Sequence, residues 1–357
     1  MSLARLASSN SFKVILTLRD AILSPAVSGA LLLALLISPE EKQSALLQHF
    51  RLPPTVTLTT VKSVLRILLG LGAIRTLSSS LSTVANNSWR LTASKGWDWP
   101  NEIAVITGGC SGIGYCTVER LVRKSIKVAI IDVQDIPQAL ANNPLVHFYK
   151  CDITSPDAVA KAADAIRRDL GHPSILINNA GIARPGTILE MRKDVIQKVF
   201  DVNCFSHWTT VQEFLPRMIQ LNKGHIVTIA SLAGFVSITK GADYCASKAA
   251  VLAFHETLGA ELRQFYRSDN VLTSVVHPNF VRTPFLDSVD GIGKMSIPML
   301  TPEQVSDRVV AQIFSRRGGE VVVPKSQEMV TAIRSWPHWF QVLIRDSMGK
   351  EAAGMNN

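Results

Sequence analysis

The stretch Glu102-Ile-Ala-Val-Ile-Thr-Gly-Gly-Cys-Ser-Gly-Ile-Gly114 decides the fold expected for this chain of 357 residues. Its first half, Glu102–Thr107, is a short apolar run that predicts a buried strand. The segment Gly112–Lys124 begins within the same glycine-rich turn and predicts a helix. A strand, a glycine-rich turn and a helix in this order are typical of the first unit of an α/β sheet.

Further along the chain, short apolar runs alternate with amphipathic segments. Helices are expected over Pro156–Leu170 and Tyr244–Phe265. The remaining strands are expected at Lys127–Ile131, Leu145–Cys151, Ser174–Asn178, His225–Ala230, Val271–Val276 and Glu320–Val323. This alternation predicts an α/β fold with a doubly wound parallel sheet, the Rossmann fold, covered by helices on both faces. Ligands of such folds bind beyond the carboxyl ends of the strands.

The glycines Gly108, Gly112 and Gly114 indicate a dinucleotide-binding turn, where they allow a tight bend, close approach of a pyrophosphate and close helix packing. Asp132 ends the second expected strand, eighteen residues after Gly114. A carboxylate there accepts hydrogen bonds from the adenine ribose and repels a 2′-phosphate. No Arg or Lys stands in the glycine loop or directly after Asp132. NAD(H) is therefore expected in preference to NADP(H).

Six motifs in order resemble the short-chain dehydrogenase/reductase family, in its short single-domain branch, over roughly Trp97 to Pro324. They are Thr107–Gly114 (TGxxxGIG), Cys151-Asp152, Asn178–Gly181 (NNAG), Asp201–Asn203, Ser231 followed by Tyr244-Cys-Ala-Ser-Lys248, and Pro278–Pro284 (PNFVRTP). One departure from the family pattern is Asn279, which stands where glycine is usual. Asn tolerates unusual backbone conformations, so we expect the nicotinamide contacts of the last motif to persist.

Tyr244 and Lys248 are four residues apart and so share one face of a helix. A cation one turn away is expected to lower the pKa of the phenol from its ordinary value near 10. By the resemblance, Tyr244 is the general acid and base, and Lys248 also binds the nicotinamide ribose. Ser231 would hold the substrate oxygen, and Asn203 would hold a water of a proton relay.

The resemblance thus implies a catalytic set and a cofactor-binding set, and no metal site is expected. The catalytic set is Asn203, Ser231, Tyr244 and Lys248. The cofactor-binding set is Gly108, Ser111, Gly112, Ile113, Gly114, Asp132, Asp152, Asn179, Tyr244, Lys248, Pro278, Val281 and Thr283. The nearby His207 and His255 are expected to serve packing, and His277 is given no role.

Residues 1–95 are more apolar than a soluble domain needs. The stretch Ala21–Ile37 carries no charge, whereas a second stretch, Thr55–Leu77, is interrupted by basic residues. We expect the first stretch to cross a membrane. The second is expected to re-enter the membrane or lie in its interface, because Lys62 and Arg66 share one helix face. A buried soluble helix is the alternative, and a polar linker is expected at Ser78–Asn87.

Charge around the first apolar stretch predicts its orientation. Arg5, Lys13 and Arg19 precede it, and Glu40 and Glu41 follow it, which places the N-terminus in the cytosol. A hairpin of both stretches returns the next domain to the cytosol, whereas a single crossing does not. We favour the hairpin because five cysteines without metal-ligand spacing indicate buried free thiols and a reducing compartment. These cysteines are Cys110, Cys116, Cys151, Cys204 and Cys245.

The charge composition of the chain limits the classes of binding partner that we expect. The net charge is +9 and the sequence pI is about 9.4, but Lys and Arg are scattered without interleaved aromatic residues. This pattern argues against nucleic-acid binding and is typical of ordinary surface charge, with attraction to anionic lipid headgroups as the weaker alternative. The apolar stripe of the helix Tyr244–Phe265 suits either core packing or a homodimer.

The segment after Thr283 predicts an apolar lid over a lipophilic substrate such as a retinoid, steroid or long-chain compound. Its apolar members are Phe285, Leu286, Ile292, Met295, Ile297, Met299 and Leu300. The layout is similar to membrane-anchored retinol and hydroxysteroid dehydrogenases. A tail that contains Trp336, Trp339 and Phe340 is expected to cover the pocket, touch the membrane interface or pack on the domain.

Three parts are therefore expected: a membrane-associated helical segment with linker at 1–95, the dehydrogenase domain at 96–330 and a tail at 331–357. The expected function is hydride transfer between NAD(H) and the alcohol or carbonyl group of a lipophilic substrate. The expected location is the endoplasmic reticulum or lipid droplets, with the domain facing the cytosol. A non-catalytic nucleotide sensor and a structural membrane protein on the same fold are the alternatives.

Overall fold

The computed structural model describes residues 17–39, 41–43, 49, 56–284 and 299–352. By its internal contacts the chain divides into two compact units, one over Leu6–Ala85 and the other containing Asn86–Asn357. The predicted lid after Thr283 lies largely in residues 285–298, outside the described residues.

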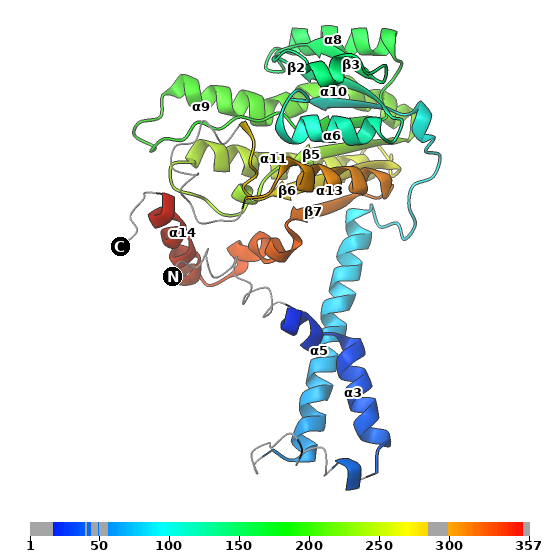
Figure 1. Ribbon diagram of the computed structural model, residues 1–357, viewed down its shortest axis with the longest axis vertical. Coiled ribbons are helices and arrows are strands. Elements are labelled where there is room, and N and C mark those ends of the chain that lie inside the picture. Colours follow the sequence, from blue (N-terminus) through cyan, green and yellow to red (C-terminus); the bar gives the residue numbers. More distant parts are fainter. Residues whose placement is uncertain (1–16, 40, 44–48, 50–55, 285–298, 353–357) are drawn as a thin grey trace. The chain divides into compact units, whose positions relative to one another are not determined.

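The larger unit is built on one seven-stranded parallel sheet in the order β3-β2-β1-β4-β5-β6-β7 (Figure 1). The order reverses between β1 and β4, and this switch point is where doubly wound folds bind ligands. The sheet confirms the predicted parallel architecture, with strand bounds within about two residues of those expected. The strands are β1 (Ile103–Thr107), β2 (Lys127–Asp132), β3 (Val146–Lys150), β4 (Ile175–Asn178), β5 (Gly224–Ile229), β6 (Val271–Pro278) and β7 (Gly319–Val323).

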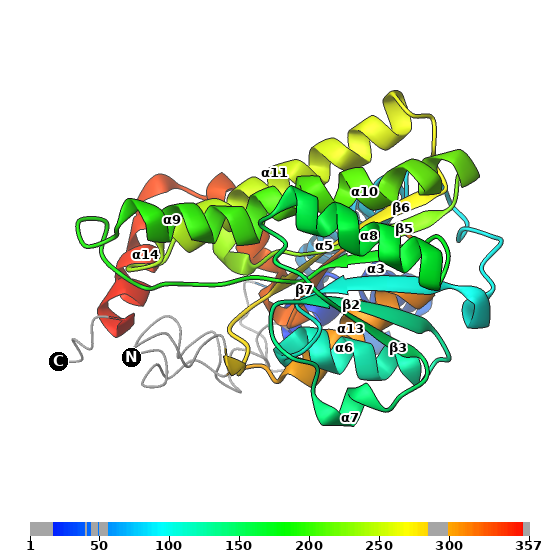
Figure 2. The same ribbon diagram turned by 90° about the horizontal axis from the view of Figure 1, so that it is seen from above.

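Helices cover both faces of this sheet (Figure 2). One face packs against α6 (Gly112–Val122) and α13 (Pro302–Phe314). The other face packs against α8 (Pro156–Asp169), α10 (Ser206–Leu221) and α11 (Ala242–Gln264). Shorter elements complete the unit: α7 (Gln138–Ala141), α9 (Lys193–Phe200), the π-helical turn η2 (Asp201–Phe205), the 3₁₀ turns η1 (Trp99–Asn101), η3 (Leu232–Gly234) and η5 (Lys325–Ser335), and α14 (His338–Ala352).

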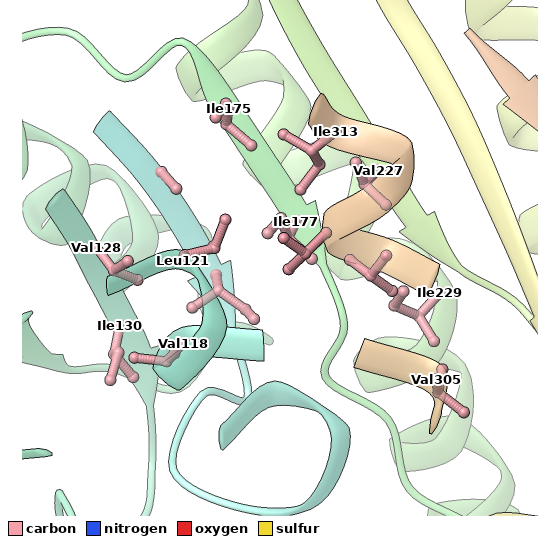
Figure 3. Close-up of a cluster of buried hydrophobic side chains, with 14 of the residues drawn as sticks. Val118, Leu121, Val128, Ile130, Ile175, Ile177, Val227, Ile229, Val305 and Ile313 are labelled. Atoms are coloured by element: carbon pink, nitrogen blue, oxygen red, sulfur yellow. The ribbon is translucent and has the colours of Figure 1, made fainter. Parts of the chain in front are cut away.

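The alternating directions of strand side chains create two apolar cores. Ala104 and Ile106 of β1 belong to the core under α6 and α13, whereas Val105 between them belongs to the core under α8 and α10. Figure 3 shows the first core, where Val118 and Leu121 of α6 meet strand side chains that also contact α13. Because both faces are buried, the central strands are apolar at nearly every position.

The smaller unit contains α3 (Pro25–Ile37) and α5 (Leu58–Asn86), which pack against each other. A Cβ at Gly72 of α5 would lie 2.5 Å from the carbonyl oxygen of Leu23. Asp20 also accepts a hydrogen bond of 2.8 Å from the guanidinium of Arg75. The two apolar stretches therefore form a helical pair, and the side chains of α5 such as Ile67 and Ile74 are more than 60% exposed.

The structure contradicts the predicted linker of this unit and shortens the first apolar helix, whose membrane crossing stays a prediction. The uncharged first stretch is broken before Pro25, where Ser24 is extended, and leaves a helix of 13 residues. About 20 Å of helix is short of the roughly 30 Å hydrocarbon core, whereas the 29-residue α5 is long and apolar enough to cross a membrane. Residues Ser78–Asn86, predicted as a linker, are the last turns of α5. Ser and Thr hydroxyls there return hydrogen bonds to carbonyls one turn earlier, which makes a polar segment compatible with a helix.

Candidate active site

A cavity of about 820 Å³ opens at the carboxyl ends of the strands around the switch point. It is lined by every predicted cofactor and catalytic residue except Gly114 and Asn203. The motifs come from segments spread over about half of the chain, and the parallel sheet brings them together at the carboxyl ends of its strands. The fold therefore brings most of the predicted site residues together around one cavity.

The glycine turn between β1 and α6 needs glycine for two different reasons. Gly108 and Gly112 have φ values of +67° and +55°, a conformation that side chains disfavour. Gly114 has no lining role, because it lies behind the turn. A Cβ at Gly114 would lie 2.0 Å from the carbonyl oxygen of Gly108, so its absence lets the helix pack closely.

Asn179 holds this turn in place. Its side-chain amide donates hydrogen bonds of 3.0 Å to the carbonyl oxygens of Thr107 and Gly108. The hydroxyl of Thr107 in turn accepts the backbone N–H groups of Asn179 and Ala180. This cross-link joins β1 to β4 across the switch point and fixes the floor of the cavity.

The residues of the turn fit a dinucleotide. Ser111 is the N-cap of α6, but its side chain makes no capping hydrogen bond to the first turn. The first N–H groups of α6 therefore receive no acceptor from this side chain. Gly112 and Ile113, which begin α6, line the cavity, and a pyrophosphate bound there would accept hydrogen bonds from these N–H groups. The left-handed glycines allow the backbone to approach such a group closely.

Asp132 is positioned at the end of β2 by the backbone around it. One carboxylate oxygen accepts the N–H of Cys110 at 2.9 Å, and the other accepts the N–H of Gln134 at 3.0 Å. The side chain is buried and lines the cavity. The nearest acidic neighbour on the same turn, Asp135, is instead exposed and pairs with Lys150 at 2.6 Å.

Asp152 lies further along the cavity wall after β3. Its carboxylate accepts hydrogen bonds from the backbone and hydroxyl of Thr154 and pairs with Lys198 at 3.2 Å. Lys198 of α9 also lines the cavity and belongs to no motif of the sequence. The sequence did not predict that Lys198 lines the cavity, because an exposed lysine on an amphipathic helix stands in no recognisable motif.

Ser231, Tyr244 and Lys248 lie together on the cavity wall. Burial raises the pKa of Tyr244 to about 12, although its hydrogen bond with Ser231 acts in the opposite direction. Burial also lowers the pKa of Lys248 to about 8. The Nζ of Lys248 lies 5.8 Å from the Tyr244 ring centre and donates a hydrogen bond of 2.8 Å to the carbonyl of Ile229.

This result corrects the expected pKa of the phenol. The sequence predicts that Lys248 lowers the pKa of Tyr244, but the loss of water around the phenol outweighs any nearby cation. The protein alone therefore keeps the phenol protonated near neutral pH.

Asn203 lies behind the cavity, fully buried in the π-helical turn η2. Its oxygen accepts the N–H of Ile182 at 2.7 Å, and its amide donates to the carbonyl of Ile182 and the hydroxyl of Ser247. A Cβ at Gly181 would lie 3.5 Å from the Asn203 oxygen and 3.7 Å from the Nζ of Lys248. Asn203 is therefore close to the lysine, and its predicted water-holding role stays a prediction.

Other predicted details are settled by the backbone and by burial. Asn279 has a negative φ and donates its N–H to the carbonyl of Val323 at 2.9 Å, so glycine is unnecessary there. Burial lowers the pKa of His207 to about 3 and of His255 to about 4, which suits packing. The buried His277 lies 3.2 Å from the carboxylate of Glu320. The five predicted free cysteines are all buried.

The C-terminal helix α14 reaches the same cavity. Met348 lines it, and Gly349 packs so closely on the loop before α11 that a Cβ would lie 2.6 Å from the Thr239 hydroxyl. Arg334, ahead of α14, donates to the carbonyls of Gly234 and Phe235. The tail thus covers one end of the cavity, one of three places that the sequence left open for it.

Comparison with known proteins identifies the family of this chain. The family model described as short chain dehydrogenase matches residues 102–291. The dehydrogenase RED2 of Cochliobolus heterostrophus is 40% identical over 62% of this chain and 83% of its own length. The human estradiol 17-beta-dehydrogenase 11 is 31% identical, covering 68% and 82%, and the mouse epidermal retinol dehydrogenase 2 is 32% identical, covering 70% and 82%.

Solved structures support the fold. The 3-ketoacyl-(acyl-carrier-protein) reductase from Brucella melitensis, complexed with NADH, superposes with a TM-score of 0.57 at 20% identity, covering 63% of this chain and 98% of that one. The 4-hydroxyisoleucine dehydrogenase complexed with NADH gives 0.56 at 23% identity, covering 62% and 96%. From the family match, the relatives and the assembled motifs together, we conclude that this chain belongs to the short-chain dehydrogenase/reductase family and is similar to its retinol- and hydroxysteroid-dehydrogenase-like members.

Proposed function

We propose that this protein transfers a hydride between NAD(H) and the alcohol or carbonyl carbon of a lipophilic substrate. The observation that carries the proposal is that Ser231, Tyr244 and Lys248 line the same cavity as the glycine turn and Asp132. Bound NAD(H) would supply the hydride donor or acceptor and, when oxidised, a positively charged ring. The glycine turn, Asn179 and Asp132 are the residues that would hold it.

The chain's own residues supply the proton. In carbonyl reduction, the Tyr244 phenol gives its proton to the substrate oxygen as negative charge develops there, and Ser231 donates a hydrogen bond that orients this oxygen. The raised pKa of Tyr244 keeps this acid protonated at neutral pH. Lys248, when charged, stabilises the phenolate that remains, and Asn203 is proposed to hold a water that returns a proton.

The substrate class is inferred from the walls beyond Ser231. Leu232, Val236, Ile238, Phe280 and Met348 line the same cavity as Ser231. An apolar pocket of this kind is suited to a retinoid, steroid or long-chain alcohol or carbonyl. The relatives named for estradiol and retinol support this class.

The substrate class is tested with full-length protein in detergent, NADH and a panel of retinal, steroid ketones and long-chain aldehydes, beside short water-soluble ketones. Turnover that rises with apolar substrate size supports the proposal. Turnover confined to the small polar ketones would overturn it.

Asp132 is proposed to select NAD(H) by repelling the 2′-phosphate of NADP(H). In the Asp132→Asn variant the carbonyl oxygen still accepts one backbone N–H, but the charge is lost. We expect the ratio of kcat/KM for NADH to that for NADPH to fall by about tenfold or more. This is the effect expected when the repulsion between two nearby negative charges is removed. The matched control is Asp135→Asn, on the same turn but paired with Lys150. An unchanged preference in Asp132→Asn would contradict this role.

The pKa of Lys248 predicts an alkaline limit for carbonyl reduction. Since burial lowers this pKa to about 8, the ammonium is charged below pH 8 and loses its proton above it. We expect kcat/KM with NADH to be level below that pH and to fall above it, while Tyr244 remains protonated. In the Lys248→Arg variant the fall should move to higher pH, because a guanidinium keeps its charge. A level wild-type profile up to pH 10 would contradict this assignment.

Met348 is proposed to contact the substrate. The Met348→Ala variant should raise KM for long apolar substrates by roughly tenfold, as expected when a buried apolar contact is lost. The KM for NADH should not change. Leu343→Ala, on the exposed side of the same helix, is the matched control. Equal effects of both variants would show that α14 acts only through stability.

We also propose that α5, with α3, attaches the enzyme to the endoplasmic reticulum or to lipid droplets with the domain on the cytosolic side. The length and apolar surface of α5 and the buried free thiols support this proposal. The homodimer through α11 likewise stays a proposal, supported by the exposed Trp208 on α10 and Phe265 just after α11.

A further inference from the structure

A second pocket, of about 370 Å³, opens at the amino ends of the strands, whereas the active site lies at their carboxyl ends. Its walls are Arg90 and the segment Thr92–Gly96, which precede β1, and Leu221, Asn222, Lys223 and Asn270, which precede β5 and β6. All of these residues belong to the larger unit. None of them has a place in the proposed hydride transfer.

Two buried polar groups of this pocket lack partners among the described residues. Arg90 donates to the side chain of Asn270 and, at 3.4 Å, to the carbonyl of Asn87, but its buried Nη2 has no acceptor. Ser94 is 3% exposed, and its hydroxyl has no partner either. Leaving charged and hydroxyl donors buried without acceptors is costly. A ligand with several acceptor oxygens would satisfy both.

The charges around the pocket favour an anion. Lys223 is paired with the buried Glu102 at 2.5 Å, and the negative charge of Asp269 partly balances the positive charge of Arg90. Lys95 is exposed and forms no ion pair with any described residue. One cation is thus left uncompensated beside two unpartnered donors. A singly charged phosphodiester matches this arrangement in charge and in acceptor number.

The surroundings of the pocket indicate where such a phosphate comes from. Trp89 and Leu91, on both sides of Arg90, are 65% and 75% exposed, and Leu221 on the pocket wall is 54% exposed. Exposed Trp beside Arg and Lys is typical of the membrane–water interface. Arg90 follows the end of α5 at Asn86 by four residues, a reach of at most about 14 Å. If α5 crosses a membrane, this short connection keeps Arg90 within reach of the headgroup region.

We propose that the pocket of Arg90, Ser94, Lys95 and Lys223 binds the phosphate of an anionic phospholipid, with Trp89 and Leu91 against its acyl region. The proposal rests on the membrane attachment proposed for α5, but not on the dehydrogenase activity. The phosphate oxygens accept hydrogen bonds from the free Nη2 of Arg90 and the Ser94 hydroxyl, and Lys95 supplies the balancing charge.

The test is a binding titration on full-length protein in a maltoside detergent, which carries no phosphate. The probes are dihexanoyl phosphatidylserine, dihexanoyl glycerol and inorganic phosphate. The variants are Arg90→Gln and Lys95→Gln, and the matched control is Lys161→Gln, at an exposed position of α8. NADH affinity, measured at the carboxyl ends of the strands, reports whether each variant is folded.

The expected result is saturable binding of phosphatidylserine that each pocket variant weakens by about tenfold, with Lys161→Gln unchanged. Lys95→Gln keeps the test valid if Arg90→Gln fails to fold, because Lys95 is exposed. Equal affinity for inorganic phosphate and phosphatidylserine would identify a soluble ligand and overturn the lipid assignment. Binding of dihexanoyl glycerol alone, or binding unaffected by the variants, would overturn the phosphate site.

Discussion

Replacing Tyr244 by Phe should lower kcat for carbonyl reduction by roughly 10³-fold, the contribution typical of a general acid. The ring keeps its packing in the half-buried position, and only the hydroxyl beside Ser231 is lost. NADH should therefore bind as tightly as to the wild type. The comparison is made by single-turnover NADH oxidation together with an NADH binding titration.

The matched control is Tyr266→Phe, which removes a hydroxyl from an exposed tyrosine remote from the cavity. This variant should keep full activity. Wild-type activity in Tyr244→Phe would remove the phenol from the mechanism. NADH binding without turnover in the wild type, over the whole substrate panel, would favour the nucleotide-sensor alternative.

Replacing Gly114 by Ala should destabilise the dehydrogenase domain by about 3 kcal/mol and lower its Tm by roughly 10 °C, as overpacking against rigid atoms does. The new Cβ would meet the carbonyl oxygen of Gly108 at 2.0 Å and the amide of Asn179 at 2.7 Å. The glycine turn and its clamp must both shift, so NADH affinity should fall as well. Thermal unfolding with and without NADH measures both effects.

Gly259→Ala is the matched control within α11. Its Cβ would come no closer than 3.4 Å to a neighbour, and alanine favours the helix. This variant should keep or slightly raise the Tm. A Gly114→Ala protein with wild-type Tm and NADH affinity would show that α6 can move away from the turn, contrary to the packing described.

Much of the dehydrogenase domain could be predicted because its signals are local. Apolar runs such as Lys127–Asp132 are buried on both faces of the sheet and so lack polar interruptions. The site could be predicted because each motif stands at a strand end, and a parallel sheet brings those ends together. Neither argument needs knowledge of which helix packs where.

The features that could not be predicted depend on distant contacts or on solvation. Met348 reaches the cavity only through the packing of α14, for which the sequence near it has no periodic signal. The raised pKa of Tyr244 reflects how completely the phenol is removed from water, which spacing to Lys248 does not show. The Ser-rich end of α5 resembles a linker by composition, but hydroxyl-to-carbonyl bonds let it remain helical.

The measurement that tests the central claim most directly is transfer of deuterium from NADH labelled at C4 of the nicotinamide to a lipophilic ketone or aldehyde. Full-length protein in detergent is incubated with the labelled cofactor and the substrate panel, and the product alcohols are analysed by mass spectrometry. We expect one deuterium on the carbinol carbon of the alcohol formed by the wild type, and no labelled alcohol from Tyr244→Phe. Bound NADH with no labelled alcohol from any substrate, or labelled alcohol formed equally by Tyr244→Phe, would contradict it.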